Sequence, residues 1–246
     1  MLGLSNVFHK NVDAFASKKH RYIINQGGTS STKTFSTLQL LVRIAMKSRK
    51  HIEVAGLTVP HLKAGALNDM PQVMEGWGMD FDSMYNESSK VLRFPKRRDK
   101  NGKIVKGGRI KFIAIDKVGK AHGGRRDILY INEANHMPYN IAEQLMIRTR
   151  EIVFIDYNPT SKFWAHTKLM KEQPEKCILI KSTYKDNPFL EQEIIDMIES
   201  KRGDGTNNFW RVYGMGELGV AEGLVFDNWK ENEFDKEQFE QYRHRS

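Results

Sequence analysis

The sequence predicts an α/β protein with a mainly parallel central sheet. From residue 22 to about residue 200, short apolar runs alternate with amphipathic stretches, which is typical of strands and helices that follow one another along the chain. The apolar runs are rich in Ile, Val, Leu and Phe, as in strands buried on both faces of a parallel sheet. Apolar residues make up 39% of the 246 residues, which is enough to build a core.

The order of elements follows from this alternation. The expected strands are 22–25, 52–57, 128–131, 152–155 and 178–181, and the expected helices lie at about 33–48, 61–75, 138–148, 162–172, 189–201 and 206–216. The single cysteine, Cys177, excludes an intramolecular disulfide, and no apolar run approaches the length of about 18 residues that a membrane span needs. We therefore expect a soluble protein with no membrane partner.

One segment breaks the alternation and carries most of the positive charge. The chain has a formal net charge of +9, and residues 90–126 alone contain 14 Lys or Arg and two Asp. Within it, 90–94 and 109–115 are expected strands joined by a linker with an Asn101-Gly102 turn, which predicts a basic β-hairpin inserted in the α/β core at about 90–115. A solvated excursion is the simple interpretation, but the charge favours a phosphate backbone as partner. The candidate DNA contacts are Arg93, Lys96, Arg97, Arg98, Lys100, Lys103 and Lys106.

The strongest local motif follows the first strand. It reads Gln-Gly-Gly-Thr-Ser-Ser-Thr-Lys-Thr at 26–34 and opens the expected helix, which is the context of the phosphate-binding loop of P-loop NTPases. Lys33 would reach the β- and γ-phosphates of ATP, and the Thr34 hydroxyl would bind Mg²⁺. Thr32 stands where the usual motif has its second glycine, so a turn that only caps the helix is the alternative. The residues expected around the nucleotide are Gly27, Gly28, Thr29, Ser30, Ser31, Thr32, Lys33 and Thr34.

A second polar motif ends the strand at 128–131. Additional-strand P-loop ATPases place two acids here, of which the first holds the water shell of the metal and the second activates the attacking water. Glu133 fits the second role as a general base or a water-orienting group. Asn132 keeps an oxygen acceptor but lacks the charge of the usual aspartate, so it would hold Mg²⁺ through water more weakly, or another acid would help. The alternative for Glu133 is a carboxylate that stabilises a helix N-terminus.

The strand at 152–155 also ends in polar residues. Asp156 and Asn158 would lie at the carboxyl edge of the sheet, where open α/β sheets bind ligands, and would sense the γ-phosphate or couple hydrolysis to movement. A plain turn explains Asn158-Pro159 almost equally well.

A loop with two glycines precedes the Glu133 strand and ends in Arg125 and Arg126. Either arginine would stabilise the charge of the transition state as an arginine finger. Binding of DNA phosphates and plain solvation are the alternatives for this pair.

Taken together, these motifs resemble the ATPase half of the large terminase subunit of tailed phages. The resemblance rests on the loop at 26–34, on Tyr-Ile-Asn-Glu-Ala-Asn at 130–135, on Asp-Tyr-Asn-Pro-Thr at 156–160, and on Phe-Trp-Arg-Val-Tyr-Gly-Met-Gly-Glu-Leu-Gly at 209–219. It implies a RecA-like three-layer core of the additional-strand class and a motor that uses ATP and Mg²⁺ to translocate double-stranded DNA into a procapsid. By motif position, it also implies that Glu133 is catalytic and that Asn158 lies in the coupling motif.

The resemblance further implies partners and a location. Family members form a ring on the portal protein of the procapsid and work with a small terminase subunit, in the cytoplasm of the infected bacterium. The isolated chain would then be monomeric. An arginine acting in trans lies before the Glu strand in this family, and Arg125 or Arg126 is the nearest candidate.

The expected domain organisation is an ATPase domain at 1–220, followed at 221–246 by a linker or by the start of a C-terminal nuclease domain that this chain lacks. We therefore expect no DNA cleavage by this chain. Two alternatives stay open from the sequence: a nucleic-acid-binding module with a degenerate nucleotide loop, and another P-loop ATPase that translocates DNA.

Overall fold

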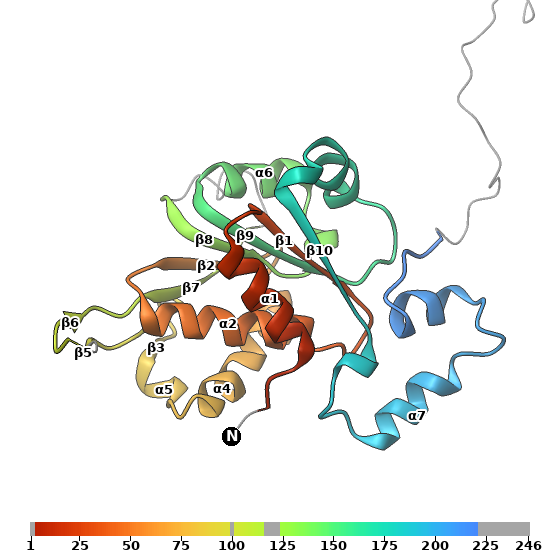
Figure 1. Cartoon of the computed structure of the whole chain (residues 1–246), viewed down its shortest axis with the longest axis horizontal. Coiled ribbons are helices and arrows are strands. Elements are labelled where there is room, and N and C mark those ends of the chain that lie inside the picture. The colour runs from red at the N-terminus through yellow and green to blue at the C-terminus, as the bar shows by residue number, and fades with distance from the viewer. Residues whose placement is uncertain (1–2, 99–100, 116–123, 221–246) are drawn as a thin grey trace, which may run out of the picture.

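The centre of the molecule is an eight-stranded sheet, and the computed structural model describes it within residues 3–98, 101–115 and 124–220 (Figure 1). The strand order is β10-β1-β9-β8-β2-β7-β4-β3. The first six strands in this order are parallel, and the last two are antiparallel to their neighbours. Their bounds are β1 Tyr22–Gly27, β2 His51–Gly56, β3 Tyr85–Asn86, β4 Val91–Arg93, β7 Arg109–Ala114, β8 Arg126–Ile131, β9 Thr149–Tyr157 and β10 Cys177–Ser182. All five strands predicted in the parallel core are present.

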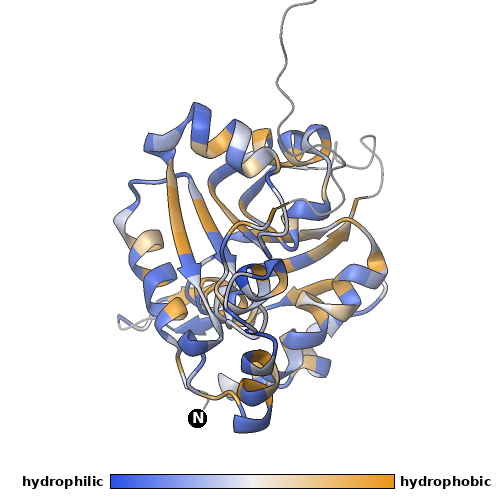
Figure 2. Cartoon of the chain, turned by 90° about the vertical axis from the view of Figure 1, so that its right-hand side faces the viewer, coloured by the Kyte–Doolittle hydropathy of each residue, from blue (hydrophilic) through white to orange (hydrophobic). Residues whose placement is uncertain are grey.

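Helices cover both faces of this sheet. Neighbouring side chains of one strand enter opposite layers: Ile23 packs into one hydrophobic cluster and Ile24 into the other. The first cluster includes residues of α1 (Asn6–Ser17), α2 (Lys33–Lys47) and α4 (Ala66–Gly76), and the second includes residues of α6 (Tyr139–Ile147) and of the π-helical segment Ala165–Met170. In Figure 2, hydrophobic residues run along the central strands while the helices alternate hydrophobic and hydrophilic residues. The result is the predicted three-layer α/β core.

The predicted helices are present with shifted bounds. Two helices, α3 (Val59–Ala64) and α4, replace the expected helix at 61–75, because Gly65 adopts a non-helical backbone conformation and interrupts the helix. The expected helix at 189–201 is α7 (Gln192–Ser200), and the one at 206–216 shortens to the π-helical segment Trp210–Gly214. Shorter helical turns are α5 (Phe81–Met84) and the 3₁₀ segments Ala134–His136, Pro174–Lys176 and Tyr184–Asp186.

Helix α1 was not expected from the sequence. Its N-cap is Ser5, whose Oγ accepts a hydrogen bond of 3.2 Å from the Phe8 backbone N–H. Phe8 is buried in the core, and the buried Asn11 amide exchanges two hydrogen bonds, of 2.8 and 2.9 Å, with the Asn25 amide of β1. The helix is therefore fixed both by buried apolar side chains and by a polar pair that the hydrophobic pattern does not reveal.

The basic hairpin is part of the main sheet. Strands β4 and β7 pair antiparallel, as predicted, but β7 also pairs in parallel with β2, and its residues Ile110 and Phe112 are buried. The part that projects from the body is a small separate ladder of β5 (Arg97–Arg98) and β6 (Ile104–Val105), at the left of Figure 1.

Lys100 and residues 221–246 lie outside the described residues. Among the helices that the structure does describe, none combines the length and the hydropathy that crossing a bilayer would require.

Candidate active site

The phosphate-loop motif lies at the carboxyl edge of the sheet, between β1 and α2. It is closed from outside by residues 209–219, which we call the strap. The Thr29 backbone N–H donates a hydrogen bond of 2.9 Å to the Tyr213 carbonyl, and the Gln26 amide donates one of 2.8 Å to the Gly216 carbonyl. A Cβ on Gly28 would lie 2.2 Å from the Tyr213 carbonyl oxygen, so only glycine fits there. Two motifs far apart in the sequence therefore form one structure.

Thr32, at the place of the usual second glycine, adopts a left-handed backbone with φ 62°. This conformation costs a non-glycine residue about 1–2 kcal/mol, which explains why glycine is usual here. The Thr32 hydroxyl donates to Ser5 Oγ at 3.0 Å and accepts from Ser36 Oγ at 3.2 Å. These hydrogen bonds tie the loop to α1 and help to hold the unfavourable backbone in place.

The two residues that end the motif point to other strands of the sheet. Lys33 Nζ donates to the Gly28 carbonyl at 3.0 Å and to Asn158 Oδ1 at 2.6 Å. Thr34 Oγ1 donates to Asp156 Oδ2 at 2.5 Å. Burial lowers the pKa of Lys33, although the charges of Asp156 and Glu133 act in the opposite direction. The structure thus places Lys33, Thr34 and Asn158 together, as the sequence predicts.

Asp156 is the centre of the hydrogen-bond network at this edge. Its side chain is 1% exposed and accepts hydrogen bonds from the Tyr130 hydroxyl at 2.8 Å, from the Asn132 amide at 3.1 Å and from the Glu133 backbone N–H at 2.7 Å. Burial, and next the Asp156 charge, raise the pKa of Tyr130 well above its usual value, so its phenol stays a donor. From the sequence, Asp156 was expected to sense the γ-phosphate or to couple hydrolysis to movement.

Glu133 lies at the mouth of a cavity of about 140 Å³ that is also lined by Lys33, Thr34, Asp156 and Asn158. Glu133 is exposed, and its backbone is left-handed, with φ 53° and ψ 52°. A non-glycine residue in this region is strained, and such strain is common at functional sites. An amine, a hydroxyl and two carboxylates therefore face one small space, which suits the binding of a phosphate chain together with a cation. The described residues contain no cluster of three or more His, Cys, Asp or Glu side chains that would bind a metal without such a ligand.

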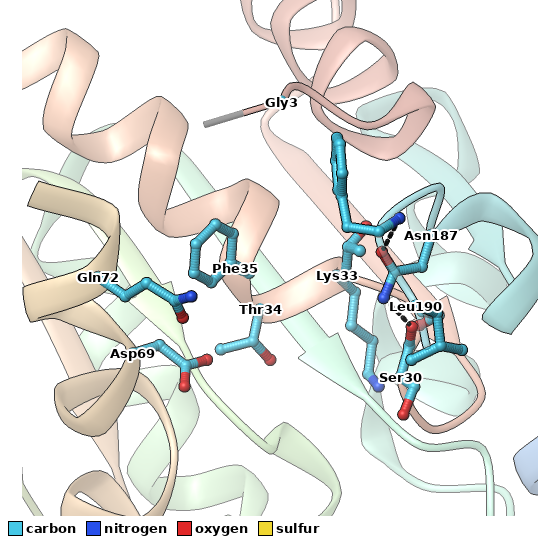
Figure 3. A pocket seen from close by; sticks show the side chains of 12 residues that line it. Gly3, Ser30, Lys33, Thr34, Phe35, Asp69, Gln72, Asn187 and Leu190 are labelled. Atoms are coloured by element: carbon cyan, nitrogen blue, oxygen red, sulfur yellow. Dashed lines mark hydrogen bonds between the residues drawn. The ribbon is translucent and has the colours of Figure 1, made fainter. Parts of the chain in front are cut away.

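On the other side of Lys33 and Thr34, a pocket of about 620 Å³ opens between α2, α4 and the segment at 187–190. Figure 3 shows Phe35, Asp69 and Gln72 on one wall and Asn187 and Leu190 on the other. The wall beside Leu190 is tied to the loop, because the Asn187 amide donates to the Ser30 carbonyl at 3.1 Å. A planar, partly apolar group attached to a phosphate chain would fit this space.

The phage terminase large subunit family matches residues 19–217 of the chain. This chain belongs to that family. No curated protein sequence matches it.

Solved terminase structures share the fold of this terminase chain. The large terminase of a thermophilic bacteriophage is 17% identical, with a TM-score of 0.73 over 93% of this chain and 57% of that protein. The same phage protein in complex with ATP-γ-S is 17% identical, with a TM-score of 0.71 over 93% of this chain and 56% of that protein. The large terminase ATPase domain of Thermus phage P74-26 is 12% identical, with a TM-score of 0.55 over 89% of this chain and 100% of that domain. The chain thus spans a little over half of the first of these proteins, and the predicted fold class is confirmed.

The two candidate finger arginines of this terminase chain differ sharply. Arg126 begins β8 and is 1% exposed; its Nε lies 2.5 Å from a carboxylate oxygen of Glu53, and its guanidinium donates to the Leu145 carbonyl at 2.9 Å. Arg126 is therefore a structural residue, and the hypothesis that it acts as a finger does not agree with this burial. Arg125 is exposed at the amino edge of the sheet, away from the phosphate loop of its own chain. Arg125 therefore does not reach the phosphate loop of its own chain.

The other basic candidates also lie at the amino edge. Arg93, Lys96 and Lys106 line a pocket of about 370 Å³ together with Arg49 and Arg109. In the projecting ladder, Arg97, Arg98 and Lys103 are exposed, and the guanidinium groups of the two arginines donate to backbone carbonyl oxygens. The structure therefore separates this basic surface from the phosphate loop by the length of the strands.

Proposed function

We propose that this terminase chain is a Mg²⁺-dependent ATPase motor that translocates double-stranded DNA into a procapsid. The observation that carries the proposal is the convergence of Lys33, Thr34, Glu133 and Asn158 on one cavity at the carboxyl edge of the sheet. Family membership and the fold shared with terminase ATPase domains support it.

The phosphate chain of ATP would lie on the loop at 27–34, at the N-terminus of α2, where backbone N–H groups and the helix dipole favour anions. Lys33 Nζ would exchange its hydrogen bonds to the Gly28 carbonyl and Asn158 Oδ1 for phosphate oxygens. The base would occupy the neighbouring pocket beside Phe35 and Leu190 (Figure 3).

The chain's own residues fit a Mg²⁺ site beside the phosphates. The Thr34 hydroxyl oxygen faces the cavity, and its proton is already directed to a carboxylate. The cation supplies positive charge that neutralises the phosphate oxygens. Asn132, which the sequence assigned to the water shell of the metal, points its amide N–H to Asp156 and its oxygen toward the Ala66 backbone N–H at 3.4 Å.

Glu133 would accept a proton from the attacking water or orient it. Its exposed carboxylate lies at the mouth of the cavity, so a water between it and the γ-phosphate would be held from both sides. Asn158, bonded to Lys33 before nucleotide binds, would lose that partner when Lys33 turns to the phosphate, and so report the nucleotide state to β9.

The test is Glu133→Gln, which keeps the shape but not the basicity. We expect hydrolysis to fall by about 10²–10⁴-fold while ATP binding is retained, because the side chain acts on water and not on the phosphates. The matched control is Glu193→Gln on the exposed face of α7, which should hydrolyse ATP like the unchanged chain. Undiminished hydrolysis in Glu133→Gln would remove the catalytic role.

The basic surface at the amino edge would contact the DNA backbone, and Arg125 would act in trans on the nucleotide of a neighbouring subunit in a ring. The ring, the portal protein, the small terminase subunit and the host cytoplasm follow from family membership as further parts of the proposal. Residues 1–220 would form the ATPase domain. Family membership, the fold shared with terminase ATPase domains and the position of Lys33 and Thr34 at one cavity favour an ATPase over a binding module with a degenerate nucleotide loop.

A further inference from the structure

We infer that Asp156, on β9, supplies the negative charge of the metal site in place of the missing aspartate at position 132. The inference rests on the proposed function and concerns how this chain holds the cation. Asp156 is a positioning residue: it acts on the cation through the Thr34 hydroxyl. Asn132 is its fixed neighbour and not a ligand.

The first argument is the direction of the Thr34 proton. Thr34 Oγ1 donates to Asp156 Oδ2 at 2.5 Å, so the hydroxyl proton is held on the side of β9. The lone pairs of the oxygen are then left facing the cavity, where a cation would bind. A hydroxyl without this acceptor would rotate, and its proton would spend part of the time toward the cation.

The second argument is the order of the strands. Strand β9 lies between β1 and β8, and Asp156 is in register with Asn25 of β1, close to the point where the phosphate loop begins. Asn132 follows β8 and is therefore one strand farther away. A carboxylate on β9 is thus better placed than one on β8 to reach the first residues of α2.

The third argument explains the asparagine. Asn132 Nδ2 donates to both carboxylate oxygens of Asp156, at 3.1 and 3.3 Å. An aspartate at 132 would put two carboxylates in contact, and one of them would have to take up a proton. Asn132 and Asp156 therefore form a matched pair with a single charge, in which the amide of one orients the carboxylate of the other.

A second carboxylate, that of Asp69, is the alternative source of the negative charge at the metal site. Asp69 of α4 lines the larger pocket together with Thr34, as Figure 3 shows. Burial raises the pKa of the Asp69 carboxyl, which disfavours its charged form. Asp156, in contrast, accepts five hydrogen bonds from four residues, one of which is the Thr34 hydroxyl itself.

The experiment measures Mn²⁺ affinity by electron paramagnetic resonance in the presence of ADP, and ADP affinity without metal by calorimetry. For Asp156→Asn we expect Mn²⁺ affinity to fall about 10–100-fold, as for other residues that orient a metal ligand, with metal-free ADP affinity unchanged. The exposed control Asp13→Asn should keep the Mn²⁺ affinity of the unchanged chain, and Asp69→Asn, which tests the competitor, should lower it less than Asp156→Asn does. Unchanged Mn²⁺ affinity in folded Asp156→Asn, or a loss in Asp69→Asn alone, would overturn the inference.

The swap Asn132→Asp with Asp156→Asn keeps one charge in the cluster and decides the matter if the single variant does not fold. We expect its Mn²⁺ affinity to stay below that of the unchanged chain, because its carboxylate is one strand farther from Thr34. A swap that binds Mn²⁺ as tightly as the unchanged chain would overturn the assignment to position 156. If the unchanged chain binds no ADP at all, the proposed function fails, and not only this inference.

Discussion

The two edges of the parallel sheet hold their charged groups in different ways. At the carboxyl edge, Lys33, Thr34 and Asp156 are fixed by short hydrogen bonds in a partly or fully buried network. At the amino edge, most arginines and lysines are exposed, and the two arginines of the projecting ladder donate to backbone oxygens. Function at the first edge depends on the geometry of single atoms, and function at the second depends on summed charge. Substitutions should therefore be all-or-none at one edge and additive at the other.

The largest effect should come from Lys33→Ala. Removing the only lysine of the loop takes away the amine that faces the cavity, so we expect ATP hydrolysis to fall by at least about a thousandfold. Steady-state phosphate release measures it, and Lys168→Ala on the outer face of the 165–170 segment is the control. A rate that stays within about tenfold of the unchanged chain would mean that this edge, too, works by summed charge.

Arg126 is the exception at the amino edge, and its removal should give the next largest effect. Because Arg126→Ala removes the arginine partner of the buried Glu53 carboxylate and leaves it His51 Nε2 at 3.4 Å, we expect the free energy of unfolding to fall by about 3–5 kcal/mol. Urea denaturation measures this loss. The neighbour Arg125→Ala should change stability by less than about 0.5 kcal/mol, since its side chain is exposed. Equal losses in the two variants would contradict the distinction drawn between them.

Paired neutralisation on the projecting ladder should have a smaller and salt-dependent effect. For Arg97→Gln with Arg98→Gln, the plot of log DNA affinity against log salt concentration should become less steep by about 1.8, if each arginine meets one phosphate. Titrations of labelled duplex DNA at several salt concentrations measure the slope. The control is Lys168→Gln with Lys171→Gln, which removes the same charge elsewhere. An all-or-none loss of DNA binding would show a specific contact instead of a distributed surface.

The smallest effect concerns Thr32 and separates strain from hydrogen bonding. Thr32→Ala loses the hydroxyl bonds to Ser5 and Ser36 and keeps the left-handed backbone, so we expect a loss of about 1 kcal/mol in stability. Thr32→Gly loses the same bonds but relieves the backbone strain, and should lie closer to the unchanged chain. Thermal unfolding of Thr32→Ala, Thr32→Gly and the unchanged chain measures the order of their stabilities. A less stable glycine variant would mean that the threonine backbone is not strained.

The five strands predicted for the parallel core could be found from the sequence because each carries apolar residues on both faces, which is a local signal. The phosphate loop, Lys33, Thr34 and Asn158 were also found locally, by motif and by position at strand ends. Helix α1 was missed although it buries Val7, Phe8 and Ala14; what could not be foreseen is the Asn11–Asn25 pair, which joins α1 to β1 by polar atoms. The sequence around Asn11 does not show that its amide will meet the amide of Asn25, because the two residues come together only in the folded chain.

The rest of the site required the order of the strands. That Asp156 and not Asn132 is bonded to Thr34 follows from the place of β9 between β1 and β8. Arg125 and Arg126 look alike in sequence, and only the position of Glu53, on another strand, shows which of the two is buried. The hairpin strands were correctly paired, but the burial of Ile110 and Phe112 against the main sheet could not be inferred from the charges around them.

The contact between the strap and the phosphate loop has one more consequence. At Thr29 the contact is a hydrogen bond between two backbone groups, the Thr29 N–H and the Tyr213 carbonyl. It therefore depends on the path of the backbone and not on the identity of the Thr29 or Tyr213 side chain. An alanine at position 29 or 213 would leave this amide and this carbonyl in place and would not reveal the contact. A genetic screen would register it at Gly28, where a single added methyl group meets the opposite backbone. Because backbone lies directly against backbone here, a displacement of the loop at Gly28 or Thr29 would push or pull the strap with no flexible side chain between them.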